Sequence, residues 1–372
     1  MRMTMDLKSI GKVLEEIAPP ALAEDWDNVG LLAGDEGQKI KRIMLTIDMT
    51  REVLTEAKDK KVDLLLAYHP PIWDPIKQVV AGKGSAPLLY EAIRANISIY
   101  ALHTALDSVV GGINDVLAEI VGIEKPEPLQ PIKVGKDQLC KLVVFVPVGE
   151  LEKVSEAMFA AGAGELGKYS RCSFRGRGMG TFQGGAGSNP SIGKVGSFEQ
   201  VEEYRLETIV PRRLLGEVIK AMLAAHPYEE VAYDVIELVT PEVDTGLGRM
   251  GKLGKATPIP ELIARIKKEL KVKAVGIIGP KRGKVHKAAV GAGSCGSLLK
   301  EVIANGCDFY LTGELKHHHG LELQEAGVTT CCVGHSNSER MILPRIARRL
   351  KKELPTVEVT VSRKDHDPCI WG

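Results

Sequence analysis

The sequence lacks the features that mark several large classes of protein. Its 372 residues include no run near the roughly 20 apolar residues that a helix needs to cross a membrane. Lysine and arginine number 49 against 48 aspartates and glutamates, so net charge indicates neither nucleic acid nor an anionic membrane as partner. The seven cysteines form no C-x-x-C pair, which argues against a disulfide framework. These absences predict a soluble, cytoplasmic protein with reduced thiols.

What is present is a composition ordinary for globular proteins, with 44% apolar and 26% charged residues. At about 150 residues per domain, the length predicts two or three domains. Strand and helix patterns alternate from residue 41 to residue 123 and again from residue 286 to residue 354. Strands joined by helical crossovers indicate an α/β fold with mostly parallel sheets flanked by helices.

A segment of different character separates these two regions. Between residues 130 and 240 the patterns follow the order β-α-β, β-α-β, which is typical of an inserted ferredoxin-like α+β domain. We therefore expect a core whose first half spans residues 1–129 and whose second half spans residues 241–372. The core would be interrupted by a domain at residues 130–240.

Polar side chains follow the predicted core strands at the points where these strands end. His69 comes before two prolines that forbid continuation of its strand. His103 and His335 end two other strands, and Asp107 and Glu339 follow them at a spacing of four residues. Because parallel strands end at the same edge of a sheet, where ligands bind, we expect these residues to converge with Glu314 and the histidines at 317–319.

Imidazole nitrogens together with carboxylate oxygens are the ligands that zinc, iron and manganese prefer, so the set predicts a metal site. Each member also has an ordinary alternative. His69 alone fits a solvated turn, and the three consecutive histidines fit an exposed helix face. Asp107 could cap a helix, and Glu339 could interact favourably with the helix dipole in the first turn of its helix.

Five ordered motifs carry a resemblance to a known family. They are WDNVGLLAG, YHPPIW, HTALDSVVGGINDVLA, TGELKHH and GHSNSE. They resemble the GTP cyclohydrolase I type 2 homologs, also called the NGG-one-interacting-factor-three-like or dinuclear metal centre family. The segment that includes HPYEEVAYDVI resembles the PII-like or CutA-like domain inserted in the longer members.

The resemblance implies two divalent metal ions per chain and a ring-shaped homohexamer whose metal sites face an inner cavity. It makes His69, His103, Asp107, His335 and Glu339 the metal ligands, with Asp107 and Glu339 as candidates for contacting both ions. Where the family often has two adjacent histidines, this chain has Tyr68 before His69. A neutral phenol is a poor ligand, so one ion would be weakly held, bound through water, or coordinated partly by another residue such as His103.

From these observations we expect a metal-dependent hydrolase in which two ions activate a shared water. Glu314 or His318 would shuttle a proton or contact a small-molecule or nucleotide substrate. The sequence contains no P-loop and no known motif for binding a purine base. One alternative is a non-catalytic regulatory or scaffold protein whose inserted domain senses a ligand. Another is a protein that stores or delivers metal ions.

Overall fold

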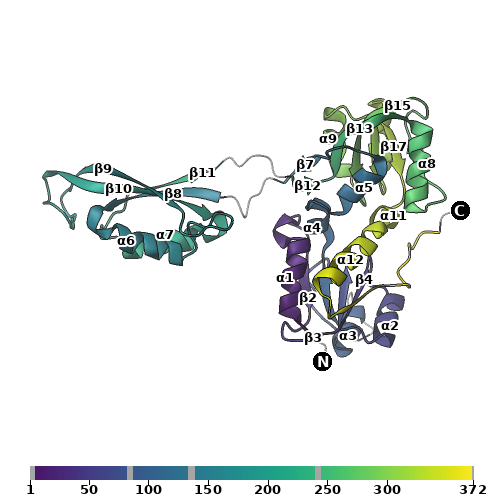
Figure 1. Ribbon diagram of the computed structural model, residues 1–372, viewed down its shortest axis with the longest axis horizontal. Helices are drawn as coiled ribbons and strands as arrows, with labels where there is room; N and C mark the ends of the chain where they lie inside the picture. The colour runs from purple at the N-terminus through teal and green to yellow at the C-terminus, as the bar shows by residue number, and fades with distance from the viewer. Residues whose placement is uncertain (1–4, 82–86, 133–138, 239–243, 371–372) are drawn as a thin grey trace. The chain divides into compact units, whose positions relative to one another are not determined.

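A computed structural model describes residues 5–81, 87–132, 139–238 and 244–370. It divides into two compact units (Figure 1). Unit 1 comprises residues 1–132 and 243–372, and unit 2 comprises residues 133–242. The architecture is mixed α/β, with several sheets flanked by helices. Within the described ranges, no helix is both long and apolar enough to cross a membrane.

One five-stranded sheet of unit 1 is built mainly from the first half of the chain. Its strand order is β18-β4-β5-β6-β2, with β2 antiparallel and the other neighbours parallel. The strands are β2 (Gly30–Ala33), β4 (Arg42–Thr46), β5 (Leu64–Ala67), β6 (Ser98–Ala101) and β18 (Glu358–Val361). The nearby helices are α1 (Leu7–Ile17), α2 (Arg51–Asp59), α3 (Pro87–Arg94), α4 (His103–Ser108) and α12 (Leu343–Glu353).

The other five-stranded sheet of unit 1 has the order β13-β15-β16-β17-β14, with a parallel centre and antiparallel edges. Its strands are β13 (Arg249–Pro258), β14 (Gly276–Ile278), β15 (Lys284–Gly291), β16 (Phe309–Thr312) and β17 (Thr329–Cys332). The helices of this region are α5 (Ile113–Val121), α8 (Ile259–Leu270), α9 (Leu299–Ala304), α10 (His317–Glu325) and α11 (His335–Glu339). The expectation of an α/β core with sheets flanked by helices is confirmed for this unit. Three of the four strand pairings in the first large sheet are parallel, and two of the four in the second.

Local chemistry explains where several of these elements begin and end. The Thr50 side chain accepts a hydrogen bond from the backbone N–H of Val53 and caps the start of α2. Gly122, with φ of +83°, ends α5 in the left-handed region that glycine tolerates. All four residues of β5 are buried, which fits the central position of this strand between β4 and β6.

A buried arginine ties the second half of the chain to the loop after α4. Arg249 is 1% exposed, and its Nε lies 2.7 Å from Oδ1 of Asp115. Its remaining N–H groups donate to backbone carbonyls, among them that of Val109. Because an unpaired buried charge is costly, this network holds in place the loop that follows α4.

Short strands pair two segments near the boundaries of unit 1. Strand β7 (Gln130–Pro131) pairs with β12 (Gly246–Leu247). A Cβ on Gly246 would lie 2.3 Å from the carbonyl oxygen of Gln130, so this close approach requires glycine. A further short pair joins β1 (Met5–Asp6) to β3 (Lys39–Ile40).

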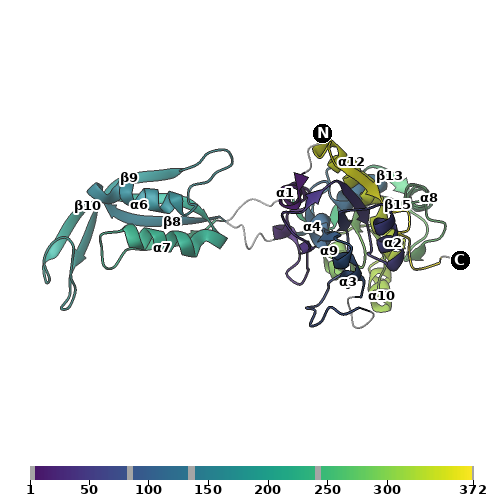
Figure 2. The ribbon, with the colours of Figure 1, turned by 90° about the horizontal axis from the view of Figure 1, so that it is seen from below.

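Unit 2 is a four-stranded antiparallel sheet in the order β11-β8-β10-β9. Its elements are β8 (Leu139–Pro147), α6 (Leu151–Ala160), β9 (Ser173–Gln183), β10 (Phe198–Pro211), α7 (Leu215–Ala225) and β11 (Tyr233–Glu237). Figures 1 and 2 show α6 and α7 on one face of this sheet, where they pack on a core that includes Val144, Val154 and Leu206.

Candidate metal site

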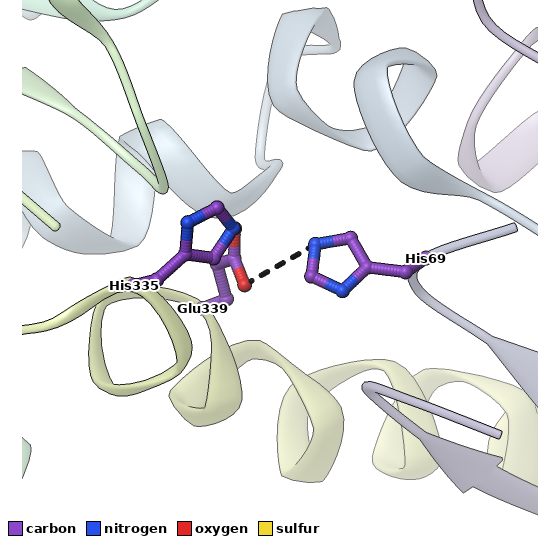
Figure 3. Close-up of side chains that lie close together, drawn as sticks. All are labelled: His69, His335 and Glu339. Atoms are coloured by element: carbon purple, nitrogen blue, oxygen red, sulfur yellow. Dashed lines mark ion pairs between the residues drawn. The ribbon is translucent and has the colours of Figure 1, made fainter. Parts of the chain in front are cut away.

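The candidate site lies in unit 1, where His69, His335 and Glu339 come together. Figure 3 shows His69 facing the other two side chains, which project from one short helix. One ligand atom from each residue lies within 4.8 Å of the others. Nε2 of His335 is 3.2 Å from Oε1 of Glu339, and Nε2 of His69 is 3.5 Å from Oε2. Nitrogen and oxygen atoms gathered in this way could hold a divalent metal ion.

Backbone pairing puts each residue in position. The N–H of His69 donates to the carbonyl of Ile47, so the chains that leave β4 and β5 stay hydrogen-bonded up to the residue before Pro70. His335 and Glu339 are the first and last residues of α11, so their spacing of four residues places them on one helical face. Gly293, with φ of +67°, passes so close that a Cβ there would lie 2.6 Å from Oε1 of Glu339.

Each histidine is oriented by a carboxylate at its other ring nitrogen. Nδ1 of His69 lies 2.9 Å from Oδ1 of Asp48, and Nδ1 of His335 lies 3.0 Å from Oε1 of Glu314. A carboxylate at Nδ1 fixes the ring and leaves Nε2 for a metal ion, which is the usual arrangement around metal-binding histidines. Glu314 therefore lies at the site as an orienting partner of His335.

The carboxylates around the two histidines stabilise positive charge at this site, as they would that of a bound cation. Burial favours the neutral form of His69, but the contacts with Asp48 and Glu339 outweigh it and raise the imidazole pKa to about 10. The contact with Glu339 likewise raises the pKa of His335 to about 9. Glu339 is 2% exposed, and burial opposes its ionisation, yet the two histidines lower its pKa. Among the described residues, the buried Oε2 of Glu339 accepts no hydrogen bond and has only the 3.5 Å contact with Nε2 of His69, so a metal ion would supply a partner for it.

His103, Asp107 and Tyr68 border this group. The ring of His103 lies 5.3 Å from that of His69, and its Nδ1 is 2.8 Å from Oδ1 of Asp27. His103 has φ of +22°, a strained conformation of the kind found at functional sites. The Tyr68 hydroxyl donates to Oδ1 of Asp107, and burial raises the pKa of Asp107 to about 7.

His318 lies apart from the other residues that the sequence singled out. A cavity of about 690 Å³ beside His69 and His335 is lined by Glu314 and His317, whereas His318 is exposed and does not line it. The His318 ring lies 4.3 Å from that of His319. Successive side chains of a helix point about 100° apart, so only part of the histidine run can face one cavity.

Sequence reasoning missed Asp27 and Asp48, the partners of His103 and His69. Asp48 lies two residues after the end of β4, so the rule of polar residues at strand ends could have found it. Asp27 lies in the motif WDNVGLLAG, but its role depends on a partner 76 residues away.

All seven cysteines are free, and Cys331 is buried while Cys332 lines the cavity.

Comparisons with known proteins find relatives over almost the whole chain. The model of the family Duf34/NIF3 (NGG1p interacting factor 3) matches residues 5–368. A Bacillus subtilis protein named GTP cyclohydrolase 1 type 2 homolog is 35% identical over 99% of both chains. A Mycobacterium tuberculosis protein of the same name is 38% identical over 85% of this chain and 83% of its own. A solved Bacillus cereus protein related to NIF3 has 34% identity and a TM-score of 0.73 over 99% of both chains.

Proposed function

The chain belongs to the Duf34/NIF3 family, and from this premise we propose that it is a metal-dependent hydrolase. The observation that carries the proposal is the buried Glu339 carboxylate between two imidazoles, each with a carboxylate at its far nitrogen. A first divalent ion would be held by His69, His335 and Glu339. A second would be held by His103 and Asp107, with Glu339 available to both.

The residues around the ions have distinct roles in this proposal. A divalent ion, when bound, lowers the pKa of a coordinated water and polarises a substrate oxygen. Asp48 and Asp27 hold the rings of His69 and His103 in place. Glu314 accepts from Nδ1 of His335 and also lines the cavity, so it could accept a proton from an incoming water or contact the substrate.

The cavity beside the histidines is the proposed substrate site. Its volume of about 690 Å³ suits a ligand of nucleotide size. Because the curated relatives are named as homologs of a GTP cyclohydrolase, GTP is the first substrate to test. We further propose that the chains assemble into a homohexamer.

A second candidate function rests on unit 2. Its β-α-β-β-α-β order supports a PII-like or CutA-like domain, and a cavity of about 740 Å³ lies against β9 and β10. Glu203, 8% exposed, and Tyr228 line this cavity and hydrogen-bond to each other at 2.9 Å. A regulatory protein whose inserted domain senses a small ligand is therefore the alternative to the enzyme.

Metal content and hydrolysis test the two candidates. Protein purified without chelator is analysed for metals, then assayed on GTP and simple phosphoesters with and without added manganese or zinc. We expect bound metal and activity that follows occupancy, and we expect the His335→Ala/Glu339→Ala double variant to lose both. His318→Ala is the matched control, because this histidine is exposed and away from the cavity. Unchanged metal content in the double variant would refute the site.

A further inference from the structure

Two large aromatic side chains lie exposed beside the candidate metal site. Trp26 is 62% exposed and Trp73 is 52% exposed, although tryptophan is usually well buried. Their ring centroids are 6.3 Å apart, and their planes differ by only 13°. The chain contains three tryptophans, so two of the three lie at this place.

Both rings are adjacent to imidazoles of the site. Trp73 lies 5.1 Å from the ring of His103 and 6.1 Å from that of His69, and Trp26 lies 5.8 Å from that of His103. The same His69 ring also contacts the Glu339 carboxylate, with 3.5 Å between Nε2 and Oε2. A ligand in contact with the tryptophans would therefore lie next to the groups proposed to hold metal.

The neighbours of the two tryptophans hold them in place. Asp27 accepts from Nδ1 of His103 and from the backbone N–H of Thr104, which fixes the segment that carries Trp26. Nδ2 of Asn28 donates to the carbonyl of Ile72 at 2.8 Å, which ties that segment to the residue before Trp73. Because these hydrogen bonds fix the segments that carry the two rings, less conformational freedom is left to lose when a ligand binds.

We propose that Trp26 and Trp73 form a stacking platform for a planar heteroaromatic ring of the substrate. The proposal rests on the proposed function, because the metal site would act on a bond carried by this ring or by its substituent. Tryptophan faces stack on such rings with little regard to ring identity, so the platform selects the ligand class. A substrate without an aromatic ring would gain nothing from these two residues.

The test compares a ring-bearing probe with a ringless one. Binding of guanosine 5′-monophosphate and of ribose 5-phosphate is measured by saturation-transfer NMR titration on the full chain as purified. In Trp26→Leu and Trp73→Leu we expect the Kd for the nucleotide to rise by about tenfold, since leucine cannot stack. Ribose 5-phosphate and zinc should bind these variants as they bind the wild type.

Two controls separate stacking from damage to the fold. Trp26→Phe keeps an aromatic face and should retain most of the nucleotide affinity. Phe198→Leu removes an exposed aromatic side chain of unit 2 and should change nothing. Equal nucleotide binding by wild type and the Trp26→Leu/Trp73→Leu double variant would overturn the platform.

Two further measurements, of oligomeric state and of metal binding, distinguish failure of the platform from failure of the proposed function. Dissociation of an oligomer in the double variant, seen by sedimentation velocity, would assign the tryptophans to a subunit contact and overturn the platform. Nucleotide binding that depends on both tryptophans, in protein that neither holds metal nor hydrolyses any substrate, would refute the proposed function and leave the platform standing.

Discussion

Oδ1 of Asp48 lies 2.9 Å from Nδ1 of His69. Each residue lies two positions past the end of one of two neighbouring parallel strands, Asp48 after β4 and His69 after β5. The contact selects the ring orientation that turns Nε2 toward Glu339. Asp48 therefore positions the His69 ring of the proposed metal site, and the first prediction concerns its removal.

Replacing Asp48 should weaken metal binding without removing a ligand. Loss of a carboxylate behind a metal-binding histidine typically costs about 10- to 100-fold in affinity. We expect a loss in this range for Asp48→Ala and a smaller loss for Asp48→Asn, which keeps an acceptor oxygen. Competition with a zinc indicator measures both, and Asp234→Asn in unit 2 is the control. Wild-type affinity in Asp48→Ala would show that the contact does not orient His69.

Metal binding should release protons. Contacts with Asp48 and Glu339 raise the pKa of His69 to about 10, and contacts with Glu339 and Glu314 raise that of His335 to about 9. We therefore expect both rings to carry a second proton at pH 7.5 when no metal is bound. A metal ion binds only neutral imidazole, so the protons must leave, and affinity should fall as the pH drops from 9 toward 7. Calorimetry of zinc binding in buffers of different ionisation enthalpy counts the protons. A count of zero would mean that the two rings are already neutral.

Substituting Tyr68 tests whether this position faces the second ion. Its hydroxyl donates to the buried Asp107, so Tyr68→Phe should lower the free energy of unfolding by about 1–3 kcal/mol, because a buried acceptor loses its donor. Tyr68→His should instead tighten the weaker ion by about tenfold, or about 1.4 kcal/mol, because imidazole is a better ligand than a phenol.

Zinc titrations of wild type, Tyr68→Phe and Tyr68→His separate the two effects. Tyr68→Phe is the matched control, since it changes the hydrogen bond without adding a ligand nitrogen. An identical second binding step in all three proteins would mean that position 68 does not face the ions.

Glu56 should make the stability of unit 1 depend on acid pH. Burial opposes its ionisation, but Lys60, Ser362 and the backbone N–H groups of Arg363 and Lys364 outweigh it and lower the pKa to about 2. A carboxyl with a depressed folded-state pKa stabilises the fold fully above its unfolded value, near 4.5. That contribution is lost progressively as the pH falls from about 5 toward 2.

Urea unfolding of Glu56→Gln checks this dependence. At pH 7 we expect the variant to be less stable than wild type by about 2 kcal/mol, and at pH 3 by roughly half of that or less. Asp59→Asn removes an exposed carboxylate of the same helix and should have little effect at either pH. A difference for Glu56→Gln that stays constant between pH 7 and pH 3 would contradict the linkage.

Much of the fold follows from local patterns in the chain. The alternation of strands and helices is visible because buried parallel strands are short apolar runs, as at β5, and because Pro70 must end such a run. His335 and Glu339 could be paired from their spacing alone, since four residues make about one helical turn. The pairing of β18 with β4 could not be predicted from local spacing, because it joins residues more than 300 positions apart.

The sequence by itself determined the α/β class, the positions of the strand-end histidines and the pairing of His335 with Glu339, because each depends on residues a few positions apart. Only the tertiary structure decided that Asp48 meets His69, that Asp27 meets His103, and that Trp26 lies parallel to Trp73. These contacts depend on strand order and on the packing of distant loops. Strand order is set by how the whole chain buries its apolar surface, which no local spacing encodes.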